Sequence, residues 1–183
     1  AGRTEVMRAL FGLDEFDSGA IKIRGKKVEI TNTSDSIDNG LVMLSEDRRR
    51  YGIVPVRSVR ENITISKLDD FIYGGRLHAE KERKTVEEMS KKLNIKTPSI
   101  ETNISSLSGG NQQKAILAKW LVNNPDVFLL DEPTRGIDVG AKFEIYKLMV
   151  ELAKEGKGIV MVSSELPELI GMCDRIYVMS EGT

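Results

Sequence analysis

Val127–Asp138 reads VFLLDEPTRGID: an apolar run leads directly into two adjacent acids, Asp131 and Glu132. A short run of this kind, bounded by turn residues, is typical of a strand buried in a parallel sheet. Side chains at the carboxyl end of such a strand lie in the crevice where an α/β sheet binds its ligand. There, Asp131 could hold Mg²⁺, directly or through water, and Glu132 could polarise an attacking water. An ordinary buried strand followed by an acidic turn, with no role in binding or catalysis, would have the same sequence pattern.

Two further apolar runs lie toward the C-terminus, Gly158–Val162 (GIVMV) and Arg175–Met179 (RIYVM), and both predict buried strands. Helical patterns occur between the runs, over Ala141–Lys154 and Glu165–Gly171. Strands that alternate with helices in this way are typical of βαβ units and a parallel sheet. The predicted fold class is therefore α/β.

The N-terminal part of the chain has a different pattern. Ala20–Ile30 alternates isoleucine and valine with polar residues around a Gly-Lys-Lys turn, which predicts an antiparallel hairpin. Thr4–Gly12 predicts a helix, Leu41–Ser45 another buried strand, and Ser58–Asn94 a polar, helical insertion. The predicted organisation is a parallel-sheet core with an antiparallel β flap and a helical insertion.

Composition limits the class of protein. The chain has 183 residues, 40% of them apolar, and a formal net charge of −1, which suits one domain and argues against nucleic-acid binding. Its single cysteine, Cys173, excludes an internal disulfide and fits a reducing compartment. No apolar run is long enough to span a bilayer, and we expect no signal peptide. The chain begins with AGRTEV and no Met, so we expect a fragment of a longer protein.

Gly2-Arg3-Thr4 stands immediately before the first predicted helix. It matches the end of a phosphate-binding loop, G-x-x-x-x-G-K-[ST], with arginine in place of lysine. Backbone N–H groups at such a helix start bind phosphate, and Thr4 would bind Mg²⁺. By themselves, these three residues fit an ordinary helix N-terminus at least as well.

Ser106–Leu121 reads SLSGGNQQKAILAKWL. Ser108 is expected to cap a helix, and Gly109 and Gly110 would let an anion approach the first free N–H groups at its positive end. Gln112 would add a neutral donor. The alternative is a glycine-rich turn into a packed helix, which leaves unexplained why Ser-Gly-Gly stands shortly before a strand ending in Asp-Glu.

LSGGNQQK followed by FLLDEPTRGID resembles the signature and Walker B motifs of ATP-binding-cassette (ABC) ATPases. The resemblance covers essentially the whole chain. The chain also resembles the second nucleotide-binding half of tandem monosaccharide importers of the ribose, galactose and xylose type, in the segments GGNQQKAILAKWL, AGRTE and SEDRR. The resemblance implies a P-loop NTPase fold in three parts: 1–57 (end of the P-loop, antiparallel flap and Q-loop region), 58–121 (helical subdomain with the signature helix) and 122–183 (parallel-sheet core).

The resemblance also implies roles for individual residues. The signature would contact the γ-phosphate of ATP held on the opposite nucleotide-binding domain, through Ser108, Gly109, Gly110 and Gln112, with Asp138 as a further ATP-binding residue. The chain's own ATP would be bound by Gly2, Arg3, Thr4 and Glu46. Mg²⁺ would be held by Thr4 and Asp131. The implied catalytic residues are Glu132 and, at the position of the family's switch histidine, Ser164.

Three positions depart from the family pattern. Arg3 replaces the P-loop lysine, and a planar guanidinium is not equivalent to a compact ammonium. Glu46 stands where glutamine is usual, and Ser164 stands where a histidine normally contacts the γ-phosphate. The chain's only histidine, His78, lies in the polar insertion and is expected at the surface. The chain's own nucleotide site is therefore expected to be weakened, while its signature serves the other half.

The resemblance implies an ATP-hydrolysing subunit of a sugar importer at the cytoplasmic face of the membrane, with ATP and Mg²⁺ as cofactors. Its partners would be a second nucleotide-binding domain and transmembrane permease subunits, and no nucleic acid. The isolated fragment is expected to be inactive. One alternative is a non-catalytic, degenerate cassette with a structural or regulatory role. Another is an ABC-type DNA-repair or chromosome ATPase, which the short insertion and neutral charge disfavour.

Overall fold

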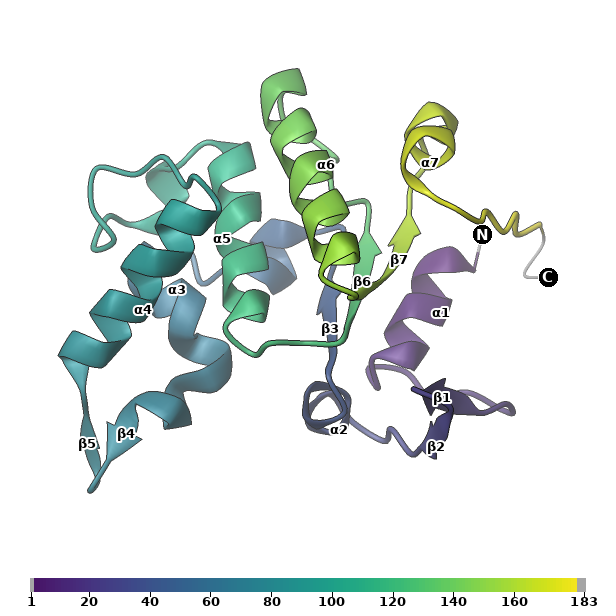
Figure 1. Cartoon of the computed structure of the whole chain (residues 1–183), viewed down its shortest axis with the longest axis horizontal. Coiled ribbons are helices and arrows are strands. Elements are labelled where there is room, and N and C mark those ends of the chain that lie inside the picture. The colour runs from purple at the N-terminus through teal and green to yellow at the C-terminus, as the bar shows by residue number, and fades with distance from the viewer. Residues whose placement is uncertain (1, 181–183) are drawn as a thin grey trace. The chain divides into compact units, whose positions relative to one another are not determined.

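The computed structural model describes residues 2–180, and these form two compact units (Figure 1). The sheet unit contains residues 2–44, 125–133 and 149–180, and the helical unit contains residues 45–124 and 134–148. These units do not coincide with the three predicted ranges, because residues 45–57, 122–124 and 134–148 group with the helical insertion. The outer ends of the ranges 1–57 and 122–183 lie outside the described residues.

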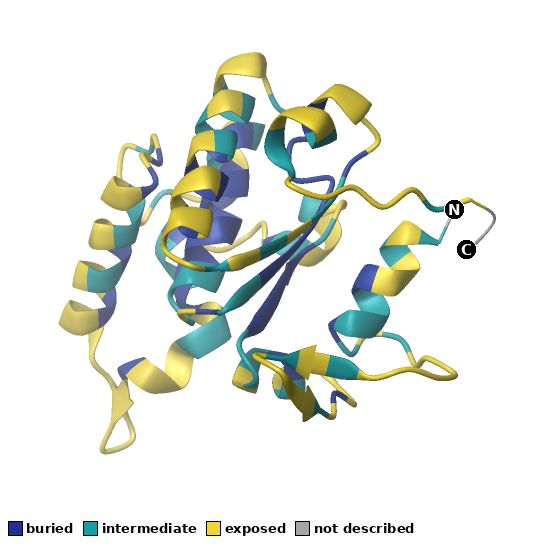
Figure 2. Ribbon diagram, turned by 45° about the vertical axis from the view of Figure 1, so that its right-hand side comes forward, coloured by how far each residue is buried: buried dark blue, intermediate teal, exposed yellow. Residues whose placement is uncertain are grey.

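The sheet unit is built on three parallel strands in the order β3 (Leu41–Leu44), β6 (Val127–Asp131) and β7 (Gly158–Val162). Leu44 pairs with Leu130 and Asp131 pairs with Val162, so the three strands end at one edge of the sheet. Strand β3 is buried throughout and β6 nearly so, as their dark blue ribbons show in Figure 2. The strands predicted over Leu41–Ser45, Val127–Leu130 and Gly158–Val162 are confirmed, and Asp131 lies at the carboxyl end of β6.

The rest of the sheet unit flanks these strands. Helix α1 (Arg3–Leu10) packs against β6, and Met7, which is 1% exposed, is its buried residue. The antiparallel flap is confirmed as β1 (Ile21–Ile23) and β2 (Lys26–Val28). Two short helices complete the unit, α2 (Thr33–Asp38) and α7 (Leu166–Met172).

The strand predicted over Arg175–Met179 is wrong. Residues 175–179 are neither helix nor strand, and Tyr177 and Val178 are 78% and 85% exposed. A strand needs a hydrogen-bonded neighbour, and none of the described strands pairs with this run. Local apolar composition cannot supply that neighbour.

The helical unit is built around three helices, α3 (Val59–Thr64), α4 (Ala79–Lys92) and α5 (Gly109–Leu121), with α3 packing against the other two. Val59, Ile63 and Val86 are fully buried, and each such side chain contributes about 1.5–3 kcal/mol of burial energy. Shorter segments connect the helices: the π-helical turn η1 (Arg48–Gly52) and the 3₁₀ segments η2 (Ile65–Phe71) and η3 (Ile104–Ser106).

An ion pair with a buried carboxylate joins α3 to α4. The Arg60 guanidinium donates to Glu82 at 2.6 Å and to Glu101 at 2.9 Å, and the Thr64 hydroxyl donates to Glu82 at 2.7 Å. Glu82 is only 1% exposed, so these donors replace the water that its carboxylate loses. The start of α3 is fixed by a capping box between Ser58 and Glu61.

A small hairpin between η2 and α4 was not predicted. Its strands, β4 (Ile72–Tyr73) and β5 (Arg76–Leu77), are joined by Gly74 and Gly75, which have φ of 58° and 73°. Positive φ at both central residues is the geometry of the two-residue hairpin turn that glycine favours. The Gly-Gly pair between Tyr73 and Arg76, with Ile72 and Leu77 on either side, was the signal for it.

Helix α6 (Val139–Lys154) is shared between the units. Its residues 139–148 belong to the helical unit and its residues 149–154 to the sheet unit. The helix predicted over Ala141–Lys154 is therefore confirmed, with two more residues at its start.

Candidate functional site

Asp131 ends β6 inside the sheet unit and is 1% exposed. Neither of its carboxylate oxygens has a hydrogen-bond partner among the residues that the structure describes. Burial raises the pKa of this carboxyl, and the charge of Glu132 adds to the rise, while the Thr4 hydroxyl beside it acts in the opposite direction. An unpartnered, buried carboxylate is costly unless a cation neutralises it.

These groups fit a magnesium site. Mg²⁺ prefers oxygen ligands and commonly takes one or two protein ligands, with water and substrate phosphates completing its shell. The orphaned Asp131 carboxylate and the Thr4 hydroxyl near it are such ligands. Within residues 2–180, no three histidine, cysteine or acidic side chains gather as an all-protein metal site would require. The donor set suits a cation that arrives with a phosphate ligand.

Glu132 has an unusual backbone conformation for its residue type, with φ of 49°. Its N–H donates to the carbonyl of Val162 at 2.9 Å, which extends the pairing of β6 and β7 by one residue. Its side chain accepts a hydrogen bond from the Ser164 hydroxyl at 3.2 Å. The structure therefore brings the two predicted catalytic residues, Glu132 and Ser164, into contact.

The predicted phosphate-binding segment lies at the start of α1. Gly2 precedes the helix with φ of 93°, a conformation that favours glycine. Arg3 is exposed, and one terminal nitrogen of its guanidinium donates to the backbone carbonyl of Ser163 at 2.9 Å. Arg3 and Ser164, which stand at the expected positions of the P-loop lysine and the switch histidine, therefore each have a hydrogen-bond partner. Arg3 donates to the Ser163 carbonyl in the loop after β7, and Ser164 donates to the Glu132 carboxylate.

In the helical unit, Ser108 takes the N-cap position of α5 as predicted, and it is exposed. Its hydroxyl does not cap a backbone N–H, and instead accepts a hydrogen bond from the Asn111 amide at 3.0 Å. The first intrahelical bond runs from the Gln112 N–H to the Ser108 carbonyl, so the preceding N–H groups have no intrahelical acceptor. The helix start can therefore meet an external anion.

Gly110 differs from Gly109 in what surrounds it. Gly110 is buried, and a Cβ built on it would lie 2.4 Å from the Cβ of Ala141 on α6. Carbon atoms pack at about 3.5–4.0 Å, so only glycine fits between α5 and the start of α6. The second glycine therefore has a packing role that the sequence pattern did not reveal.

Gln112 departs from its predicted role. It is 5% exposed, and its amide donates to the carbonyls of Ile104 and Leu107 at 3.3 and 3.0 Å. Its side-chain hydrogens are committed inside the helical unit, so the amide is not available to a phosphate. Position 112 faces the interior because it lies one helical turn from the core residue Ile116.

Glu46 and Asp138 both have partners within the helical unit. Glu46 forms an ion pair with Arg135, and Asp138 accepts a hydrogen bond from the Ala141 N–H at 2.9 Å, at the start of α6. Asp138 and Ser108, which precedes α5, are both exposed residues of this unit. The roles of Glu46 and Asp138 toward ATP remain predictions.

Lys119 on α5 was missed by the sequence analysis. Its buried side chain forms no ion pair with a carboxylate within residues 2–180; it donates to the Gly52 carbonyl at 2.8 Å and lies over the ring of Trp120 at 4.7 Å. Burial lowers the pKa of this ammonium from 10.5 to about 8. Because the unfolded chain then holds the proton more tightly, the free energy of unfolding rises with pH between about 8 and 10.5.

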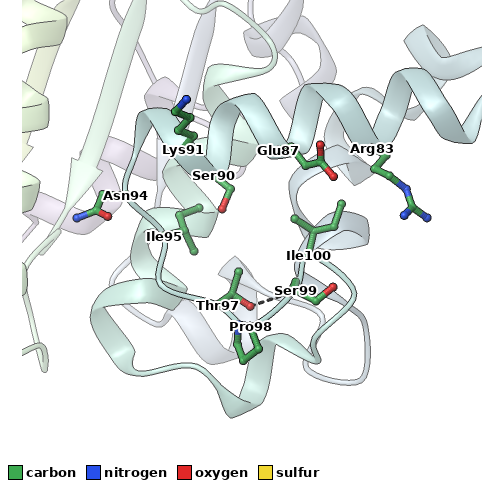
Figure 3. A pocket seen from close by; sticks show the side chains of 10 residues that line it. All are labelled: Arg83, Glu87, Ser90, Lys91, Asn94, Ile95, Thr97, Pro98, Ser99 and Ile100. Atoms are coloured by element: carbon green, nitrogen blue, oxygen red, sulfur yellow. Dashed lines mark hydrogen bonds between the residues drawn. The ribbon is translucent and has the colours of Figure 1, made fainter.

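Two remaining surfaces carry none of the predicted site residues. His78 is exposed, as expected, and lies edge-on to the Tyr73 ring. A pocket lies between α4 and the loop that follows it, and Figure 3 shows residues of both lining it, among them Arg83, Glu87 and Lys91 on the helix and Thr97 on the loop. Its lining mixes opposite charges.

None of the helices formed by residues 2–180 is long and apolar enough to cross a bilayer.

The sequence matches the family described as ABC transporter over residues 1–135. It is 52% identical, across its whole length, to the xylose import ATP-binding protein XylG of Photobacterium profundum, of which it covers 36%. It is also 52% identical to the ribose import ATP-binding protein RbsA of Lactococcus lactis subsp. lactis, over 100% of this chain and 37% of that protein. The chain thus spans little more than a third of the length of these relatives.

Solved structures give the same fold. A nucleotide-free ATP-binding cassette from an ABC transporter has a TM-score of 0.81 at 20% identity, over 99% of this chain and 73% of that one. A dimeric ATP-binding cassette in a post-hydrolysis state with ADP and Pi has a TM-score of 0.73 at 23% identity, over 91% of this chain and 71% of that one. The predicted P-loop NTPase α/β fold is confirmed.

Proposed function

This chain belongs to the ABC transporter family, and we propose that it is a segment of the ATP-binding subunit of a monosaccharide importer. The observation that carries the proposal is the identity of about half of all residues, over the whole chain, with proteins named for xylose and ribose import. The segment would be the second nucleotide-binding half of a tandem subunit.

The helical unit supports a role in trans. Ser108 and Asp138 are exposed, and the start of α5 leaves N–H groups without intrahelical acceptors. A helix start of this kind stabilises negative charge on a bound phosphate. We propose that this face contacts the γ-phosphate of ATP held by the other nucleotide-binding half.

The sheet unit supports a weakened site of its own. Bound Mg²⁺–ATP would supply an electrophilic phosphorus and a neutralising cation, and Asp131 and Thr4 are the residues that would hold the metal. One terminal nitrogen of Arg3 donates to the Ser163 carbonyl, and Glu132 accepts a hydrogen bond from Ser164. A carboxylate polarises water usefully only where the phosphate is held in line, so hydrolysis here would be slow.

The proposed partners follow from the same role. A nucleotide-binding subunit that powers import would act with transmembrane permease subunits at the cytoplasmic face of the membrane. An exposed aromatic side chain on the helical unit, Tyr51 at 58%, is a candidate contact for them, whereas the nearby Ile53 is 8% exposed and belongs to the core of that unit.

The test is ATP turnover of the full-length protein assembled with its permease subunits. Glu132→Gln is compared with the matching Glu→Gln change in the other half. We expect a loss of about 10²–10³-fold from the change in the other half, the scale of one lost electrostatic catalytic group, and less than about tenfold from Glu132→Gln. Equal losses would show that both sites hydrolyse ATP and would contradict the asymmetric proposal.

A second candidate is a nucleotide-binding half that never hydrolyses ATP and acts only as a regulatory partner. The observation that favours it is the pairing of both altered residues, Arg3 and Ser164, with neighbours in the sheet unit. Turnover that is insensitive to Glu132→Gln and to Ser108→Arg would favour this candidate. Loss of turnover with Ser108→Arg alone would favour the trans-acting half.

A further inference from the structure

The turn between residues 46 and 52 is fastened to two other parts of the helical unit. Arg48 leaves this turn and donates from its two terminal nitrogens to the carbonyls of Arg135 and Gly136, at 3.0 and 3.3 Å. At the other end of the turn, the Gly52 carbonyl accepts a hydrogen bond from Lys119 on α5 at 2.8 Å. Arg135 itself returns to the turn through its ion pair with Glu46.

Arg48 also contacts the start of α5. A Cβ built on Gly109 would lie 2.8 Å from one terminal nitrogen of Arg48, so the bare backbone at position 109 leaves room for this guanidinium. A Cβ on Gly136 would lie within 4 Å of the same group. The guanidinium therefore lies between the start of α5 and the segment that leads to Asp138.

A planar guanidinium suits this position because its nitrogens donate in two fixed directions at once. The carbonyls of Arg135 and Gly136 are successive, and both are met by one side chain. The turn that carries Arg48 is itself fixed by Asp47, whose carboxylate accepts from the N–H groups of Arg49 and Arg50 at 3.1 and 3.0 Å. Hydrogen bonds thus fix both the turn that carries Arg48 and the two terminal nitrogens of its guanidinium.

We propose that Arg48 is the positioning residue that holds the start of the signature helix and the 135–138 segment in one fixed arrangement. The arrangement matters because both parts carry exposed groups, Ser108 and Asp138, on the face that would contact the other half's nucleotide. The inference rests on the proposed trans-acting role of the helical unit. It assigns Arg48 no contact with the nucleotide.

The test uses the full-length protein with its permease subunits and compares Arg48→Ala with Arg49→Ala. Arg49 is exposed and lies on the same turn, so its substitution removes the same charge without the two carbonyl contacts. We expect Arg48→Ala to lower the maximal turnover at least about tenfold, because small misplacements of a catalytic constellation are costly, with KM for ATP unchanged. Arg49→Ala should match the wild type, and Arg48→Lys, which keeps one donor direction, should fall between them.

Hydrogen exchange provides a readout that is independent of activity. Arg48→Ala should speed amide exchange in 135–141 and at the start of α5, while exchange in α4 stays unchanged. Turnover and exchange that match Arg49→Ala would overturn the inference, and faster exchange throughout the protein would too, because it would indicate a general folding role. If the wild type shows no turnover, the proposed function fails, and the exchange pattern alone then decides whether Arg48 fixes these segments.

Discussion

Gly110→Ala tests whether the second signature glycine is required by packing. The added methyl would lie 2.4 Å from the Cβ of Ala141, at least about 1 Å closer than carbon atoms tolerate. Overpacking of this kind costs about 1–3 kcal/mol. Alanine gains at most about 1 kcal/mol over glycine in a helix, and less near its start, so the clash outweighs the gain. We expect the free energy of unfolding to fall by about 1–2 kcal/mol.

The second-site change Ala141→Gly should rescue this variant. With the Ala141 methyl removed, the next atom met by the new methyl is the Cα of residue 141 at 3.8 Å, an ordinary van der Waals distance. The double variant should therefore recover most of the lost stability, with an interaction energy of about 1–3 kcal/mol in a double-mutant cycle. Denaturant unfolding of the two single variants and the double variant measures it.

Gly109→Ala with Ala141→Gly is the matched control. The methyl at position 109 would meet Arg48 and not Ala141, so the second change should give no rescue. The reasoning would be refuted if Gly110→Ala were no less stable than the wild type, or if Ala141→Gly failed to restore it. ATP turnover of the full-length Gly110→Ala/Ala141→Gly variant should recover together with its stability, because the clash at the start of α5 is then removed.

The remaining predictions concern three other positions. Lys119→Met should remove the part of the pH dependence that this buried ammonium causes. Wild-type stability should gain up to about 3 kcal/mol relative to the variant between pH 8 and 10.5, with Lys84→Met, at an exposed site, as the control. Ser108→Arg should abolish turnover of the full-length protein but leave ATP binding to the other half intact in equilibrium binding, and loss of that binding would contradict a role in trans. Tyr51→Asp should weaken assembly with the permease subunits in co-purification, and unchanged assembly would exclude this exposed ring from the interface.

The elements that could be predicted from the sequence are those whose own pattern is strong. Leu41–Leu44 and Val127–Asp131 are strands because they are apolar, short and buried on both faces of the sheet. Helix α5 begins at Gly109, directly after the predicted cap, and α6 follows its predicted periodicity. Arg175–Met179 has a similar apolar pattern but no neighbouring strand, and pairing is decided by the rest of the fold.

The position of Asp131 and Glu132 at the end of a strand could be predicted from the sequence, but the contacts around the candidate site could not. Motif order placed Asp131 and Glu132 at a sheet edge, and the structure has them there. That Gln112 turns inward, or that Gly110 meets Ala141, depends on packing between segments that are distant in the chain. Lys119 gives no local signal at all, because one lysine on an amphipathic helix is usually exposed.

The ion pair between Arg60 and Glu82 limits how this chain can change over generations. Loss of Arg60 alone would leave the buried Glu82 carboxylate with only the Thr64 donor, at a cost of about 3–5 kcal/mol, whereas loss of Glu82 alone would leave Arg60 partly exposed and still paired with Glu101. The cost of losing Arg60 is a large share of the roughly 5–15 kcal/mol that keeps a domain folded. Replacement of both partners by apolar residues of similar volume can be neutral or favourable. The route from an ionic to an apolar interior is therefore easier when position 82 changes first, and arginine at position 60 should be kept wherever position 82 is acidic among descendants of a common ancestor.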